Sequence, residues 1–109
     1  MGDDLIYGLA PAHYAAIAEI ISRFPAVERV LIYGSRAKGT AKPASDFDLA
    51  VFGATVTSED FAKLWAELDA LPLAFKLDVL HWDTLGNAAL REKISAEGQP
   101  FFPLREPGA

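Results

Sequence analysis

Three aspartates are the residues of this sequence whose type and spacing could do chemistry. Asp46 and Asp48 stand two apart in an alternating stretch, so both side chains point to one face of a strand, about 7 Å apart. Asp78 lies inside a second apolar stretch, LDVL. Carboxylates gathered together repel one another unless cations bind them. Oxygen ligands of this kind suit Mg²⁺ or Mn²⁺.

Each of these acids also has a purely structural explanation. Asp46 and Asp48 could line the solvent face of their strand, and Asp78 could lie on the exposed side of an edge strand. A lone buried acid without a partner is costly, so Asp78 in an apolar strand favours the metal-ligand interpretation. The residues alone leave both explanations open.

A short loop ahead of the acidic pair offers groups that bind phosphate. Gly34 and Ser35 open the loop GSRAKGTAKPAS, which could contain one helical turn. Glycine lets the backbone approach a ligand closely, and the serine hydroxyl and backbone N–H groups can donate to phosphate oxygens. Arg36 and Lys38 supply positive charge. The alternative is a plain turn with a solvated basic pair, and the Walker A pattern does not occur.

Composition narrows the class of protein. The chain has 109 residues, a formal net charge of −5 and no cysteine. This predicts a single domain, 1–109, with a core over about 11–102 and loose ends. The charge argues against a general nucleic-acid binder, and disulfide scaffolds and cysteine zinc sites are excluded. Without a basic signal peptide or a membrane-length apolar run, we expect a cytoplasmic protein.

The elements that must position these residues can be predicted from hydrophobic spacing. Helices are expected from Pro11 to Pro25, from Thr57 or Ser58 to Leu71, and from Leu85 to Gly98; strands are expected over 29–33, 46–53 and 75–82. Trp65 belongs to an apolar helical stripe and is expected in the core. Glu92, Lys93 and Glu97 are expected on a solvated helix face. Phe101 and Phe102 are expected to cover a sheet edge or to dock a partner.

The combined pattern is more specific than its parts. Gly34-Ser35, ten residues, Asp46-Phe47-Asp48 and then Asp78 make G-S-x10-D-x-D…D. The stretch YGSRAKGTAKPASDFDLAVFG closely resembles the minimal nucleotidyltransferases of the DNA polymerase β-like superfamily. KLDVLHW and LREKISAEGQPFF add weaker support, and the resemblance spans about residues 11–102. It implies an α/β (α+β) fold, a small mixed sheet with helices packed on it.

The resemblance also implies roles for individual residues. Gly34 and Ser35 would hold the β- and γ-phosphates of ATP or another nucleoside triphosphate. Asp46 and Asp48 would bind two Mg²⁺ ions, with Mn²⁺ as an alternative metal. Asp78 would ligate one metal and assist the attacking hydroxyl.

Three further residues are nucleotide-binding candidates on the same resemblance: Arg36, Lys38 and Ser45. Lys38 stands where the family often has arginine, and Phe47 where it often has isoleucine. Neither difference removes a ligand.

The activity implied is transfer of a nucleotide, AMP from ATP, to a hydroxyl acceptor with release of pyrophosphate. Proteins of this type are commonly paired with a helical HEPN protein in toxin–antitoxin systems, so a HEPN-type partner is the expected acceptor. Two alternatives stay open. The chain could act as a neutralising subunit whose catalysis is dispensable, or it could modify a small molecule.

Overall fold

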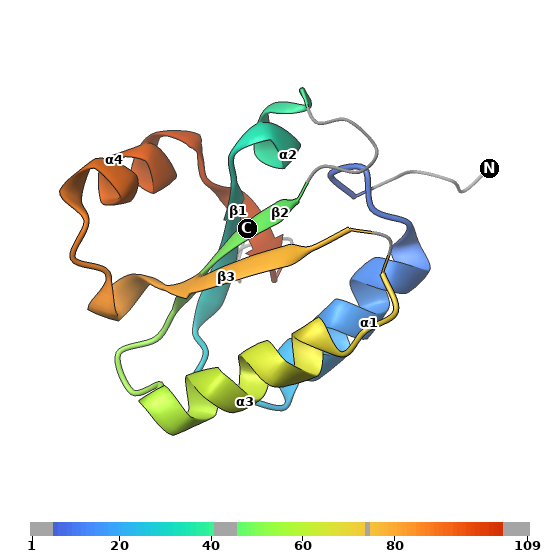
Figure 1. Ribbon diagram of the computed structural model, residues 1–109, viewed down its shortest axis with the longest axis horizontal. Coiled ribbons are helices and arrows are strands. Elements are labelled where there is room, and N and C mark those ends of the chain that lie inside the picture. The colour runs from blue at the N-terminus through green and yellow to red at the C-terminus, as the bar shows by residue number, and fades with distance from the viewer. Residues whose placement is uncertain (1–5, 41–45, 74, 104–109) are drawn as a thin grey trace.

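A computed structural model of the protein describes residues 6–40, 46–73 and 75–103 (Figure 1). Its elements follow one another as α1 (Pro11–Ser22), β1 (Arg29–Tyr33), α2 (Ser35–Lys38), β2 (Phe47–Phe52), α3 (Ser58–Asp69), β3 (Leu77–His81), a 3₁₀ turn η1 (Trp82–Thr84), α4 (Ala88–Glu97) and β4 (Gln99–Phe102). The predicted order of helices and strands is confirmed as far as α4, and β4 is an additional element. Within the described ranges, no helix is both long and apolar enough to cross a bilayer.

The strands form one mixed sheet in the order β3-β2-β1-β4. β2 runs antiparallel to β1 and parallel to β3, and β4 runs antiparallel to β1. A parallel pair needs a long crossover connection, which α3 provides between β2 and β3. The prediction of a small mixed sheet with packed helices is confirmed.

β4 is the strand that the sequence pattern misses. It has only four residues, includes Pro100, and its aromatic residues are adjacent instead of alternating. It pairs with β1 across a register shift between Val30 and Leu31. Phe101 is fully buried, so this segment covers the edge of β1, one of the two roles expected for it.

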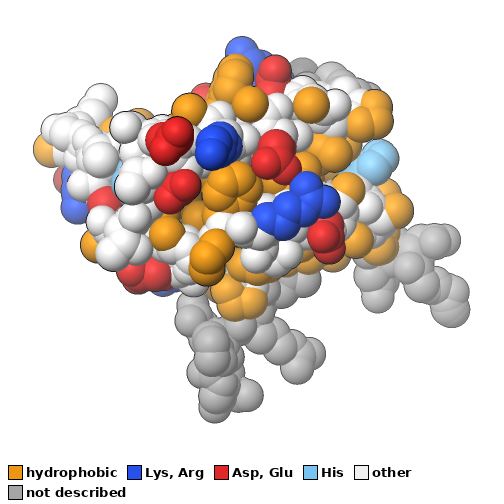
Figure 2. All heavy atoms as spheres, turned by 90° about the horizontal axis from the view of Figure 1, so that it is seen from below, with side chains coloured by type: hydrophobic (Ala, Val, Ile, Leu, Met, Phe, Trp, Pro, Cys, Tyr) orange, Lys and Arg blue, Asp and Glu red, His pale blue; other side chains and the backbone are white. Residues whose placement is uncertain are grey.

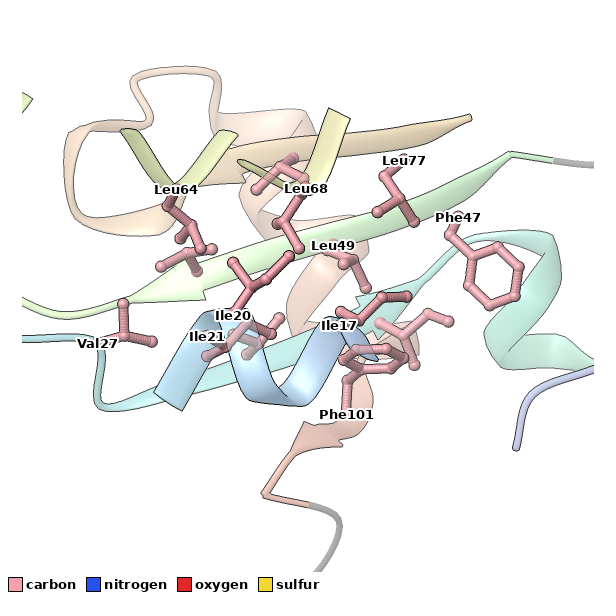
Figure 3. Close-up of a cluster of buried hydrophobic side chains, with 14 of the residues drawn as sticks. Ile17, Ile20, Ile21, Val27, Phe47, Leu49, Leu64, Leu68, Leu77 and Phe101 are labelled. Atoms are coloured by element: carbon pink, nitrogen blue, oxygen red, sulfur yellow. The ribbon is translucent and has the colours of Figure 1, made fainter. Parts of the chain in front are cut away.

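Helices cover both faces of the sheet. α1 and α3 lie together below it in Figure 1, and α4 lies on the opposite side. Figure 3 shows the first of these interfaces, in which α1 and α3 contribute Ile17, Ile20, Ile21, Leu64 and Leu68, and the sheet contributes Phe47, Leu49, Leu77 and Phe101. The β2 residues that alternate with Asp48 are therefore the ones buried in this interface. The opposite face packs Tyr33 and Ala50 against Ile94 of α4.

The apolar stripe of α3 is narrower than its spacing predicts. Leu64 and Leu68 are buried, but 41% of the Trp65 surface is exposed, so the expectation of a core position for Trp65 is wrong. Successive residues turn by about 100° around a helix, and only the Leu64 side of α3 meets the sheet. The helix begins as predicted, because the Thr57 hydroxyl accepts a hydrogen bond from the Asp60 N–H at 3.0 Å.

The outer surface of the α1–α3 layer carries mixed charge. Figure 2 looks onto this layer and shows acidic and basic side chains interspersed among apolar ones. Arg23, which follows the last residue of α1, donates to Glu67 of α3 at 3.0 Å. The described part of this face therefore offers no continuous basic surface of the kind that binds nucleic acid nonspecifically.

Residues 6–9 belong to the packed structure and differ from the expectation of a loose end. Leu9 is 1% exposed and lies in the main core. The Tyr7 hydroxyl donates to the Pro100 carbonyl at 2.7 Å, and the Tyr14 hydroxyl donates to the Phe101 carbonyl at 2.6 Å. These contacts fasten the segment before α1 and the start of α1 onto β4. Sequence spacing gives no sign of them, because they join residues 93 and 87 positions apart.

Candidate active site

Asp48 and Asp78 lie side by side on neighbouring strands. In the parallel register of β2 and β3 they are direct partners, which places their backbones about 4.8 Å apart. On its other side Asp48 is the partner of Tyr33 in β1. Asp46 stands two residues before Asp48, just ahead of β2, and is exposed. Because the β2 residues that alternate with Asp48 are buried against α1 and α3, the Asp48 carboxylate projects from the α4 face of the sheet.

Gly34 turns the backbone directly against this carboxylate. Its φ of 79° is in the region that favours glycine, and a Cβ at this position would lie 2.6 Å from Asp48 Oδ2. Ser35 then opens α2, a single helical turn that ends at Gly39 with φ 76°. The predicted helical turn in the loop is confirmed, and the fold brings the glycine turn and the acidic strands together.

The electrostatics of Asp48 are those of an acidic cluster. Burial raises the pKa of its carboxyl, and the charges of Asp78 and Asp46 raise it further, while Lys93 of α4 opposes them. Burial and the charges of the same Asp48 and Asp78 also raise the pKa of Tyr33 to about 12. The site therefore disfavours negative charge until a cation or a basic group compensates it.

The carboxylates form an open group and not a closed metal cage. In the parts of the chain that the structure describes, no three His, Cys, Asp or Glu side chains converge closely enough to enclose an ion. Asp48 and Asp78 nevertheless supply hard oxygen donors whose repulsion a cation would relieve. Mg²⁺ in nucleotide enzymes is usually held by one or two carboxylates together with substrate phosphates and water. The donor chemistry of this pair fits such an ion.

Two of the basic candidates are engaged elsewhere. The Arg36 guanidinium is buried over the Phe47 ring at 4.2 Å and near Phe75 at 5.7 Å, on the face opposite the Asp48 carboxylate. Burial lowers the pKa of Arg36. Lys38 Nζ lies 3.0 Å from Glu97 Oε2. The predicted phosphate contacts of both residues stay predictions, and Ser45 lies outside the described residues.

The end of α4 contributes residues that sequence reasoning placed on a solvated face. Lys93 acts on the charge of Asp48, and Glu97 pairs with Lys38. For Glu97 that expectation holds only in part, because 22% of its side chain is exposed while its Oε1 atom is buried. The sequence pattern does not predict this position because it does not predict β4. The strand after Gly98 pairs with β1 and so brings the last turn of α4 beside the Gly34 turn.

Comparison with known proteins gives a consistent result. Residues 15–105 match the family model described as polymerase beta, nucleotidyltransferase. A solved structure described as a minimal nucleotidyltransferase is 32% identical to this chain, with a TM-score of 0.63. That alignment covers 82% of this chain and 89% of the other. A search of curated proteins finds no significant match.

Two toxin–antitoxin structures share the fold at lower identity. One contains AMP-PNP, is 21% identical and has a TM-score of 0.65, with 81% of this chain and 71% of the other covered. The second is a tri-AMPylated HEPN toxin from Shewanella oneidensis in complex with its MNT antitoxin. It is 17% identical with a TM-score of 0.59, and the alignment covers 83% of this chain and 69% of the other.

Proposed function

This chain belongs to the polymerase β-type nucleotidyltransferase family, and from that premise we propose that it transfers AMP from ATP to a hydroxyl acceptor and releases pyrophosphate. The observation that carries the proposal is the alignment of Asp48 with Asp78 beside the Gly34 turn. In this arrangement the carboxylates can bind a cation and accept a proton, and the backbone of the Gly34 turn can bind phosphate. Because ATP is the donor, we propose that the reaction takes place in the cytoplasm.

The proposed reaction assigns separate tasks to the residues of the chain. The acceptor oxygen forms a bond to the α-phosphorus, the bond from that phosphorus to the bridging oxygen breaks, and pyrophosphate leaves with the electron pair. Asp78, exposed on the outer strand, accepts the proton of the attacking hydroxyl. Tyr33 keeps its proton until about pH 12 and therefore serves as a neutral neighbour and not as a base.

The remaining residues bind and orient the nucleotide. The backbone and hydroxyl of Gly34 and Ser35 donate to the β- and γ-phosphates, and Lys38 adds positive charge. Asp46, Asp48 and Asp78 would hold Mg²⁺ or Mn²⁺, which supplies positive charge for the phosphates when bound. Positioning and charge stabilisation account for most catalysis in phosphoryl transfer.

For the acceptor we propose a hydroxyl side chain on a HEPN-type helical protein. The support is indirect: a protein of the same fold was found in complex with an AMPylated HEPN toxin, and another toxin–antitoxin complex holds AMP-PNP. The experiment must distinguish this proposal from two alternatives. The protein could modify a small molecule, or it could neutralise a partner without catalysis.

The test uses ATP labelled on the α-phosphate, with MgCl₂ and an extract of the source cells, resolved on a denaturing gel. Wild type should label one protein band, which mass spectrometry identifies. Asp48→Asn should reduce labelling by about 100-fold or more, because one charge-stabilising group contributes about 2.7–4 kcal/mol. Asp69→Asn, which makes the same substitution at an exposed position on α3, serves as the matched control and should label normally.

The other outcomes separate the alternatives. Pyrophosphate release without a labelled band would indicate a small-molecule acceptor. Absence of both, with Asp48→Asn still neutralising the partner in cells, would indicate a binding subunit. Labelling by Asp48→Asn within threefold of wild type would remove Asp48 from the mechanism.

A further inference from the structure

Glu97, the last residue of α4, has an unusual environment for a surface-helix acid. Its Oε2 atom lies 3.0 Å from Lys38 Nζ. Its Oε1 atom is buried and, among the described residues, is the one buried side-chain nitrogen or oxygen without a hydrogen-bond partner. Leaving a buried charged oxygen without a donor is costly, so this position calls for an explanation.

The backbone fixes Glu97 at this position. Gly98 follows it, and a Cβ there would lie 2.6 Å from the Ile94 carbonyl and 2.9 Å from Leu31 Cδ1. The Gly98 N–H donates to that same carbonyl at 2.7 Å. The last turn of α4 therefore sits against β1, close to where β1 leads into Gly34.

The groups around the Glu97 carboxylate are those that bind anions. A hydrogen bond from Lys38 holds the pKa of Glu97 below its usual range, and the charges of Lys38 and Lys93 and the Gly34 amide act in the same direction against burial. The ammonium group of Lys38 thus lies against one oxygen of the carboxylate, and the charge of Lys93 and the Gly34 amide favour its anionic form. A phosphate group, with more oxygens than a carboxylate, could use the same donors more completely.

We propose that Glu97 is a further residue of the nucleotide site, where its carboxylate occupies the anion position of the Gly34–Lys38 turn until a terminal phosphate of the nucleotide displaces it. This inference rests on the proposed function, because it requires that the turn receive a triphosphate. The two anions exclude each other by repulsion and by their shared donors. Binding then transfers Lys38 from the carboxylate to the phosphate.

The exchange has a measurable consequence for affinity. A protein whose binding-competent form is only partly populated binds its ligand more weakly by that fraction. In wild type, the Lys38–Glu97 pair must open before the triphosphate binds. Glu97→Gln removes the competing charge, so the Kd for AMP-PNP should fall by about 2- to 5-fold, as expected for opening a partly exposed ion pair.

The experiment measures the Kd of AMP-PNP and of AMP by calorimetry at fixed MgCl₂ and ionic strength. Wild type, Glu97→Gln and Glu92→Gln are compared. Glu92 is the matched control because it is exposed and lies on the same helix as Glu97. Both residues line a shallow cavity of about 340 Å³. Glu92→Gln therefore removes the same charge at a position without the Lys38 contact. The gain should be specific to Glu97→Gln and to AMP-PNP, since AMP lacks the terminal phosphates.

Each other result overturns the inference. Equal affinities for Glu97→Gln and Glu92→Gln would show that the carboxylate does not compete. Weaker AMP-PNP binding by Glu97→Gln, with wild-type binding intact, would make Glu97 a group that supports the nucleotide. Absence of AMP-PNP binding in wild type and in both variants would instead defeat the proposed function, and the inference with it.

Discussion

Gly34 and Asp48 fit against each other with no room for one more carbon atom. The carboxylate oxygen is 2.6 Å from the place where a Cβ would lie. Asp48 in turn is flanked by Asp78 and Tyr33 in adjacent strands. At the scale of single residues, the Asp48 carboxylate thus leaves no room for a side chain at position 34, and on its other side the charge of Asp78 repels it.

Gly34→Ala should be more destabilising than an ordinary glycine substitution. The positive φ and the contact with Asp48 together should lower the free energy of unfolding by about 3 kcal/mol, measured by urea denaturation. Gly39→Ala is the comparison, because Gly39 also has a positive φ but a left-handed helical ψ of 16°, against −156° at Gly34, and nothing lies within 4 Å of its Cβ position. It should lose about 1 kcal/mol. Equal losses would show that neither the backbone conformation of Gly34 nor its contact with Asp48 adds to the cost of a left-handed alanine.

Asp48→Asn should stabilise the protein without ligand at neutral pH. Because burial and the neighbouring acids raise the folded-state pKa of Asp48 above its ordinary 3.8, its favourable contribution exists below pH 3.8 and is lost as the pH rises through the raised pKa. The gain in unfolding free energy should therefore be present at pH 7 and shrink towards pH 4. Denaturant titrations at both pH values measure it, with Asp69→Asn as the comparison; a gain that grows on acidification would contradict the assignment.

At the scale of elements, local spacing predicts what each strand buries and misses what distant segments do to one another. Alternation in β2 is sufficient to place Asp48 on the face opposite Phe47 and Leu49. A single acid in the apolar stretch of β3 is sufficient to make Asp78 a candidate residue. The parallel register that makes Asp48 and Asp78 partners, and the pairing of β4 with β1, depend on contacts far apart in sequence. Spacing along α4 predicts a solvated position for Glu97, whereas the pairing of β4 with β1 brings this residue close to Lys38.

Two apolar residues test this distinction directly. Leu9 lies in a stretch without periodicity yet is 1% exposed, whereas Trp65 lies on a helical stripe yet is 41% exposed. Leu9→Ala should lower the free energy of unfolding by about 2–5 kcal/mol, as large-to-small changes in cores do. Trp65→Ala should cost less than about 1 kcal/mol. Urea denaturation of both variants checks the order, and the reverse order would restore the prediction from spacing.

At the scale of the whole molecule, one small sheet holds the acids on the α4 face while α1 and α3 fill the core on the other. The fold class could be predicted, and so could the helical turn after Gly34, because the residues that carry these predictions are close together in the sequence. The roles of the candidate site residues stay predictions. Binding of a nucleotide should act on this entire unit, since the proposed site draws on β1, α2, β2, β3 and the end of α4.

MgCl₂ with AMP-PNP should therefore raise the melting temperature of the protein. A ligand at about 100 times its Kd stabilises the folded state by about 2.7 kcal/mol, which corresponds to roughly 10 °C for a domain of this size. Scanning fluorimetry measures the shift, and Asp48→Asn should lose most of it. A wild-type melting temperature unaffected by millimolar AMP-PNP would count against the site.

The pairing of β4 with β1 also governs when the protein can fold as it is made. Tyr7 and Tyr14 bond to carbonyls at positions 100 and 101, and Phe101 fills the core beneath them. Contacts between segments so far apart form late and slow folding. During synthesis, residue 102 must leave the ribosome before β4 can pair with β1. Until then the edge of β1 is exposed and the core lacks Phe101. The Gly34 turn and Glu97 can therefore meet only after nearly all of the described chain has emerged, so partial translation products should hold no assembled site.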